Sequence, residues 1–122
     1  MLEQYKAKAE HYLCSCLGRN GGNGSDNVER SPGGMLYMRQ WNNLQYGSSA
    51  AFLLTVYSHY LSDANTSSAG GRGQGLLRFP AGAHAAPSDL LALAHSQADY
   101  ILGRNPPWFR AMLRLLLRIS FE

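Results

Sequence analysis

Cysteine, charged residues and long apolar runs are all scarce in this chain of 122 residues. The two cysteines exclude a disulfide-stapled small protein, and by themselves they cannot hold a structural zinc ion. No apolar run approaches the roughly 18 to 20 residues that span a bilayer, so we expect no transmembrane segment. The first ten residues carry four charges and no apolar stretch, which predicts no signal peptide in this chain.

Charged residues make up only 16% of the sequence against 45% hydrophobic residues, which is typical of a folded chain. The formal net charge is +3, and the last 16 residues contribute +2 of it through three arginines and one glutamate. Residues 1–106 therefore hold 8 basic and 7 acidic side chains. A balance this even lacks the basic stripe that binds a phosphate backbone, so we expect no nucleic-acid partner.

Apolar residues at helical spacing predict four helices, and the expected fold class is therefore all-α. The predicted helices are residues 2–17, residues 45–62, a segment that follows Pro87-Ser88-Asp89 and runs to Leu102, and residues 107–119. The helix at 45–62 is apolar nearly all round, so we expect it to be buried. Residues 18–44 and 64–86 predict two long, glycine-rich loops. One buried helix with two neighbouring helices does not enclose a core. We therefore expect the chain to be part of a larger domain.

No pattern of titratable residues predicts a metal, cofactor or catalytic site. Cys14 and Cys16 lie about 200° apart around a helix, so they cannot face one ion or each other. We expect them to be two small buried side chains. The four histidines form no pair one helical turn apart, and the eight carboxylates are scattered. Asp99 lies in an apolar stretch, where a salt bridge or a capping role is expected.

The segment of residues 31–46 is the richest in side chains that suit a ligand. It places Tyr37, Trp41 and Tyr46 among amides and Arg39, without a strong helical period. Flat aromatic rings beside amide and guanidinium donors suit sugars, because sugar C–H groups stack on aromatic faces while hydroxyls need fixed donors and acceptors. The alternative is that Trp41 and Tyr37 pack the loop onto the core, and composition alone favours this alternative.

Four stretches, taken in order, form a more specific pattern. Two are the helix end Cys14-Ser15-Cys16-Leu17-Gly18 and the turn Ser31-Pro32-Gly33-Gly34-Met35. The other two are R-Q-W-N-N-L-Q-Y at residues 39–46 and S-Q-A-D-Y-I-L-G-R-N-P at residues 96–106. Together they resemble the motifs of glycoside hydrolase family 9, the plant-type endo-β-1,4-glucanases.

The resemblance implies an (α/α)6 barrel, of which this chain would supply about three helices. Residues 1–106 would be a segment of the catalytic domain, and residues 107–122 a divergent tail. Trp41 and Tyr46 occupy family positions that bind substrate, a cellulose-type β-1,4-glucan. The family reaction is inverting hydrolysis, which needs an acid and a base typically about 6.5 to 9.5 Å apart. Neither family motif for these carboxylates is present, so we assign no catalytic residue and expect the chain alone to be inactive.

The resemblance also implies a monomer without a cofactor or metal, acting outside the cell or in the cell wall during polysaccharide degradation. Two other functions stay open. A non-catalytic glucan-binding pseudoenzyme fragment would share the sugar surface and lack turnover. A small membrane-associating helical protein is the other, because Arg110, Arg114 and Arg118 recur every four residues in an apolar segment. A reading frame altered after Pro106 would produce the same tail by accident, so membrane association is less favoured.

Overall fold

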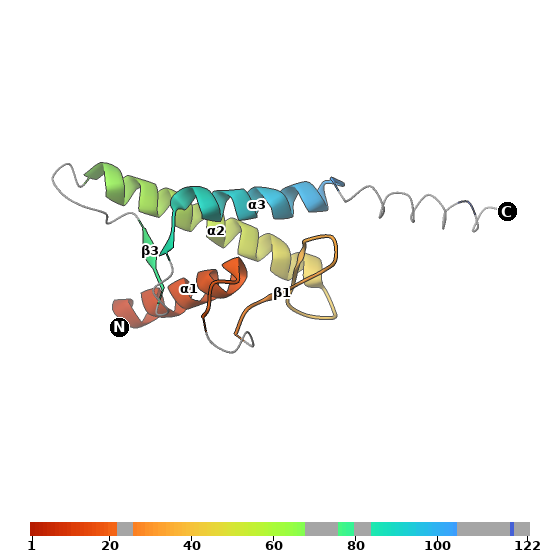
Figure 1. The fold of residues 1–122 in the computed structure, drawn as a ribbon, viewed down its shortest axis with the longest axis horizontal. Helices are drawn as coiled ribbons and strands as arrows, with labels where there is room; N and C mark the ends of the chain where they lie inside the picture. Colours follow the sequence, from red (N-terminus) through yellow and green to blue (C-terminus); the bar gives the residue numbers. More distant parts are fainter. Residues whose placement is uncertain (22–25, 68–75, 80–83, 105–117, 119–122) are drawn as a thin grey trace.

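The computed structural model describes residues 1–21, 26–67, 76–79, 84–104 and 118. This part of the chain contains three helices, α1 (Leu2–Leu17), α2 (Asn43–Ser67) and α3 (Pro87–Ile101). α2 and α3 lie side by side and run in opposite directions, with α1 below the pair in the view of Figure 1. The all-α class is thus confirmed, and the three helices fit part of an (α/α)6 barrel. Apart from Arg118, the helix expected at residues 107–119 lies outside the described residues.

α1 has the bounds that its apolar spacing predicts. Gly18 ends it in the left-handed conformation, with a φ of 70°, which a residue with a β-carbon adopts less readily. The N–H of Gly18 donates to the carbonyl of Ser15, and the N–H of Arg19 donates to that of Cys14. These bonds satisfy carbonyls that the last helical turn leaves without partners. The same end of α1 is buried, from Leu13 to Cys16, so α1 is held to the core by its C-terminal half.

α2 extends beyond the expected range at both ends, to Asn43 and to Ser67. Residues 62–67 contain no glycine or proline, so nothing in them stops the helix. α3 begins at Pro87, whose fixed φ suits the first helical position. The carboxylate of Asp89 accepts the N–H of Ala86 at 3.2 Å, so Asp89 caps this helix from its first turn.

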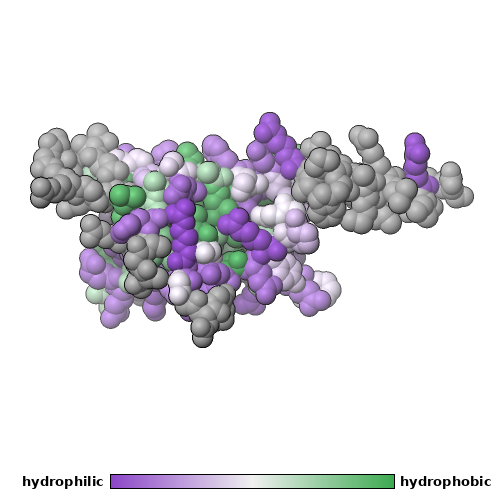
Figure 2. All heavy atoms as spheres, in the orientation of Figure 1, coloured by the Kyte–Doolittle hydropathy of each residue, from purple (hydrophilic) through white to green (hydrophobic). Residues whose placement is uncertain are grey.

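α2 is buried on one face only, whereas its nearly uniform apolar composition predicts burial all round. Ala50 and Leu54 are at most 1% exposed. Phe52, Val56 and Tyr60 follow one another at four-residue spacing and are 72%, 47% and 54% exposed. The prediction is wrong for this outer stripe of α2, because the other described elements cover the opposite face. Hydrophobic atoms are visible between hydrophilic ones over the helical pair in Figure 2.

Two small antiparallel hairpins replace the structureless loops that the glycine-rich segments predict. The first pairs β1 (Glu29–Arg30) with β2 (Leu36–Tyr37), and the second pairs β3 (Leu77–Arg78) with β4 (His84–Ala85). Each strand has two residues, and each hairpin sends apolar side chains into the core. Leu36 comes from the first hairpin, and Leu77 and Ala85 come from the second. None of the helices in the described ranges is long and apolar enough to cross a membrane.

Candidate functional site

An open hollow of about 550 Å³ lies beside the first hairpin. Its wall combines one residue of α1, the two strands of the hairpin with their flanking residues, and the first turns of α2. The lining residues are Tyr12, Asn27, Val28, Glu29, Tyr37, Met38, Arg39 and Tyr46. Three tyrosines, one guanidinium and one amide therefore face a space large enough for a sugar ring. Such a mixture of aromatic faces with a few placed polar groups is typical of small-ligand sites.

Tyr46 and Trp41 are placed differently by the fold. Tyr46 lines the hollow and is 38% exposed, and the guanidinium carbon of Arg39 lies 5.5 Å from the centroid of its ring. Trp41 is 81% exposed and lies outside the hollow, on the turn that joins β2 to α2. The indole therefore does not pack into the core of this chain, and Tyr37, at 42% exposed, is only partly covered. The aromatic residues of this segment form a surface rather than a plug.

The turn that carries Trp41 is closed by Asn43, a residue that the sequence analysis does not single out. Its side-chain oxygen accepts the N–H of Met38 at 2.8 Å, and its side-chain nitrogen donates to the carbonyl of Leu36 at 2.8 Å. The preceding residue, Asn42, has a φ of 53°, a left-handed conformation that asparagine tolerates better than most residues. A capping asparagine accepts free N–H groups of the helix that follows, whereas the Asn43 side chain bonds the strand and turn that precede α2, so the capping signal does not predict this role.

Gln97 on α3 also holds the first hairpin in place. Its side chain is 1% exposed; its oxygen accepts the N–H of Leu36 at 2.8 Å, and its nitrogen donates to the carbonyl of Gly34 at 3.1 Å. Gly33 packs against the ring of Tyr100, where an added β-carbon would lie 2.7 Å from the ring atom Cε2. Glycine at this position therefore allows the hairpin turn to approach α3 closely. These contacts therefore give the turn at residues 31–35 a structural role.

Tyr12 joins α1 to the wall of the hollow. Its hydroxyl donates to the sulfur of Met38 at 3.3 Å. Burial, followed by the neighbouring Cys16 thiol, raises the pKa of Tyr12 to about 12. Burial likewise raises the pKa of Cys16 to about 11. Cys14 and Cys16 are both buried and free, as predicted, and a thiol that stays protonated at neutral pH is a poor nucleophile.

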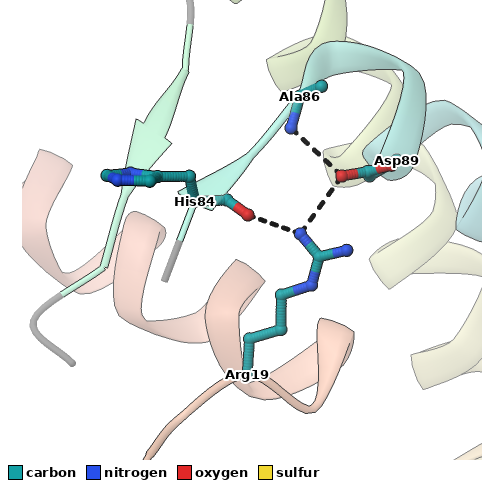
Figure 3. A network of polar contacts seen from close by, with 4 residues as sticks. All are labelled: Arg19, His84, Ala86 and Asp89. Carbon is teal, nitrogen blue, oxygen red and sulfur yellow. Dashed lines mark hydrogen bonds and ion pairs between the residues drawn. The ribbon is translucent and has the colours of Figure 1, made fainter. Parts of the chain in front are cut away.

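The second hairpin is attached through a polar network around Arg19 (Figure 3). One guanidinium nitrogen of Arg19 donates to the carbonyl of His84 at 2.6 Å and to the carboxylate of Asp89 at 3.1 Å. The same carboxylate accepts the N–H of Ala86. The network therefore links the end of α1, β4 and the start of α3, and none of its members lines the hollow.

Carboxylates do not come together as a catalytic pair at the hollow. Glu29 is the single acidic side chain among the described residues that line it. Glu10 accepts the Tyr57 hydroxyl at 2.7 Å, and Asp99 forms a salt bridge with Arg104 at 3.3 Å, as expected for Asp99. Within the ranges that the structure describes, no three metal-ligating side chains are grouped together. The geometry offers stacking and hydrogen bonding, without an acid and a base that face each other.

Comparison with known proteins supplies the remaining observation. The sequence profile of glycosyl hydrolase family 9 matches residues 1–109. Endoglucanase 22 of Oryza sativa subsp. japonica is 67% identical over 106 residues, which cover 87% of this chain and 18% of that protein. Endoglucanases 7 and 21 of the same organism are each 55% identical over 106 and 105 residues, or 86% of this chain and 18% of theirs. The chain thus spans under a fifth of these relatives' length. No solved structure matches it significantly.

Proposed function

Because the chain belongs to glycosyl hydrolase family 9, we propose that it is a segment of an endo-β-1,4-glucanase that binds β-1,4-glucan. The binding surface consists of Trp41, Arg39 and Tyr46. Relatives that share 55% to 67% identity with the chain are named endoglucanases, which supports the substrate class. The proposed place of action is the cell wall or the extracellular space, where such a glucan occurs, and the proposed state is a monomer.

The observation that carries this proposal is the 81% exposure of Trp41 on a turn that Asn43 closes. An exposed indole is available to a ligand, and its flat apolar face matches the axial C–H face of a glucosyl ring. The guanidinium carbon of Arg39 lies 5.5 Å from the centroid of the Tyr46 ring. Arg39 belongs to the turn that carries Trp41, so a cationic donor and a second ring lie beside this turn. Stacking from the rings and hydrogen bonding from the guanidinium are the two interactions that a glucan chain needs.

The proposed contribution of this chain to the family reaction is binding, and we assign it no catalytic residue. Inverting hydrolysis places an acid and a base on opposite sides of the scissile bond, about 6.5 to 9.5 Å apart. Glu29 stands alone among the described residues of the hollow, so one carboxylate cannot supply both functions there. We therefore propose that the chain by itself binds glucan without hydrolysing it.

Substitution of Trp41 by alanine tests the binding proposal. In a full-length family member with the same 39–46 segment, loss of stacking should weaken cellooligosaccharide binding by roughly 1 to 3 kcal/mol, measured by calorimetry. The melting temperature should fall by only a few degrees, because truncating a packed tryptophan, at about 3 to 5 kcal/mol, is the costlier case. Unchanged affinity with a collapsed melting temperature would show that Trp41 is a packing residue.

The 122-residue chain itself offers a matched control. Phe52 is another exposed aromatic residue, and it lies on the outer stripe of α2 rather than beside the hollow. Retention of the chain in a gel that contains soluble cellulose derivative should fall for Trp41→Ala and stay unchanged for Phe52→Ala. Equal loss for both variants would mean that any apolar surface retains the chain, and the proposed site would be wrong.

A separate assay tests the absence of turnover. Reducing-sugar release from a soluble cellulose derivative should equal that of buffer when the purified chain is added. Release that disappears in Glu29→Gln would place a catalytic carboxylate in the hollow and contradict the binding-only proposal. The membrane alternative depends on arginines in the 107–122 tail, which lie outside the described residues except for Arg118.

A further inference from the structure

We infer that Asn43 is the positioning residue of the glucan surface, an inference that rests on the proposed function. Asn43 does not line the hollow and is only half-buried. It acts through the turn of residues 38–42, which carries Trp41 and begins beside the hollow at Met38. The inference is that the amide of Asn43 sets the conformation of this turn and thereby the relative placement of Trp41 and Tyr46.

The hydrogen bonds of Asn43 join both ends of the turn. The side-chain oxygen accepts the N–H of Met38 at 2.8 Å and, more weakly, that of Arg39 at 3.4 Å. The side-chain nitrogen donates to the carbonyl of Leu36 at 2.8 Å. Asn43 itself is the first residue of α2, so the same side chain fixes the end of β2 and the start of the helix. One amide therefore closes the turn.

The strand end that Asn43 holds is itself fixed. Leu36 is fully buried, and its N–H donates to the side chain of Gln97. The peptide groups of this residue are thus held by two side-chain amides, one from α2 and one from α3. On the other side of the turn, Tyr46 follows Asn43 by three residues on the same helix, about one helical turn away. A turn anchored at both ends keeps Trp41 in a defined place relative to Tyr46.

Fixing the turn matters for binding because an ordered surface need not lose conformational freedom when the ligand arrives. Without the Asn43 amide, the N–H groups of Met38 and Arg39 would turn to water, and the indole would move with the turn. Ordering a mobile, rotamer-rich side chain on binding weakens affinity by a factor of about 3 to 10 for each group that must be immobilised. We expect a loss of this size in Asn43→Ala.

The experiment compares three variants in a full-length family member with the same 39–46 segment. Asn43→Ala removes both contacts; we expect KM for soluble glucan and the dissociation constant for cellooligosaccharide to rise about 3- to 10-fold, with kcat nearly unchanged. Asn43→Asp keeps the acceptor for Met38 and Arg39 but sets a carboxylate oxygen against the Leu36 carbonyl, so it should recover only part of that affinity. Gln97→Ala is the structural control: it should lower the melting temperature more than Asn43→Ala does, and lower the affinity of the folded protein less.

Amide hydrogen exchange adds a measurement on the 122-residue chain that needs no ligand. The amide of Met38 should be protected in the wild-type chain and in Asn43→Asp, and should exchange faster in Asn43→Ala. If Asn43→Ala lowers the melting temperature while affinity, KM and Met38 protection stay at wild-type values, the positioning role is wrong. If the parallel Trp41→Ala variant binds glucan normally, the proposed function fails instead, and exchange at Met38 still decides whether Asn43 closes the turn.

Discussion

The two hairpins of this chain have the same size and are attached to the helices in different ways. The first, β1–β2, is held at β2 by neutral side-chain amides, Gln97 from α3 and Asn43 from α2, and at β1 by the guanidinium of Arg30, which donates to the Cys16 carbonyl at 3.2 Å. The second, β3–β4, is held by the charged side chain of Arg19, which reaches the His84 carbonyl and Asp89. Gln97 is 1% exposed, whereas the side chains of Arg19 and Asp89 are 37% and 40% exposed.

This difference shows where fixed geometry comes from in the molecule. A buried amide has no water to replace its buried partner, so the loss of Gln97 would leave the Leu36 N–H unsatisfied in the core. A half-exposed ion pair can exchange its partner for water at little cost. The hairpin beside the candidate site therefore has the stronger attachment, and the proposed ligand surface is built on the more rigid of the two.

Gln97→Ala should have the largest effect of the changes that test this comparison. It would leave the N–H of the buried Leu36 without a partner, whereas the carbonyl of the exposed Gly34 can turn to water, and we expect a loss of about 2 to 3 kcal/mol of unfolding free energy. Urea unfolding of the chain measures the loss. Ser96→Ala, which removes only a neighbouring hydroxyl that Gln97 contacts, is the matched control and should cost far less. Equal losses would mean that the buried amide does not hold the hairpin.

Gly33→Ala should come second. The new β-carbon would meet the Tyr100 ring at 2.7 Å, so the turn or the ring must move, at a cost of about 1 to 3 kcal/mol. The neighbouring Gly34 has a φ of 90° and no atom within 4 Å of an added β-carbon, so alanine there costs backbone strain alone. Replacing Tyr100 with alanine should relieve the first variant and leave the second unchanged. Relief of both would argue against a contact specific to Gly33.

Alkaline pH should lower the stability of the folded chain through the ionisation of Tyr12. The pKa of Tyr12 rises from 10.0 in the unfolded chain to about 12 in the folded one, because its hydroxyl is buried against Met38. The unfolded chain therefore loses this proton first, so the stabilisation is complete below pH 10 and falls as the pH rises from 10 to 12. Unfolding midpoints measured across this interval should decline less in Tyr12→Phe. An identical decline in both proteins would exclude Tyr12 as a source.

Arg19→Met should have the smallest effect. Methionine keeps an apolar stem and loses both polar contacts, and a partly exposed pair of this kind contributes roughly 0.5 to 1 kcal/mol. Added salt should remove part of the difference between the wild-type chain and the variant, because it screens exposed charges. A loss as large as that of Gln97→Ala would erase the distinction between the two attachments.

The sequence predicts the helices well, because their signals are local. The bounds of α1 follow from apolar spacing and Gly18, and α3 lies close to the predicted segment that runs to Leu102. The hairpins are not predictable in this way, since two-residue strands have too little periodicity to detect. The open face of α2 is not predictable either, because burial depends on which neighbours surround a helix.

The candidate site shows the same division. Trp41 and Tyr46 are identified from residue type and from the family resemblance, and their role in glucan binding stays a prediction. The contacts of Gln97 with Leu36 connect residues that are 61 positions apart, and no local pattern encodes them. Asn43 lies within the recognised motif, yet its role depends on how the chain turns back over residues 38–42, which the motif does not encode.

The outer stripe of α2 makes protein concentration a condition to control when the stability of this chain is measured. Phe52, Val56 and Tyr60 span nine residues, about 12 Å of helix, and each is about half exposed or more. Binding of a second apolar surface to this stripe, including the stripe of another copy, would stabilise the folded chain, and the stabilisation would increase with the concentration of that surface. Melting temperatures of the chain and of its variants should therefore be compared at the same low protein concentration.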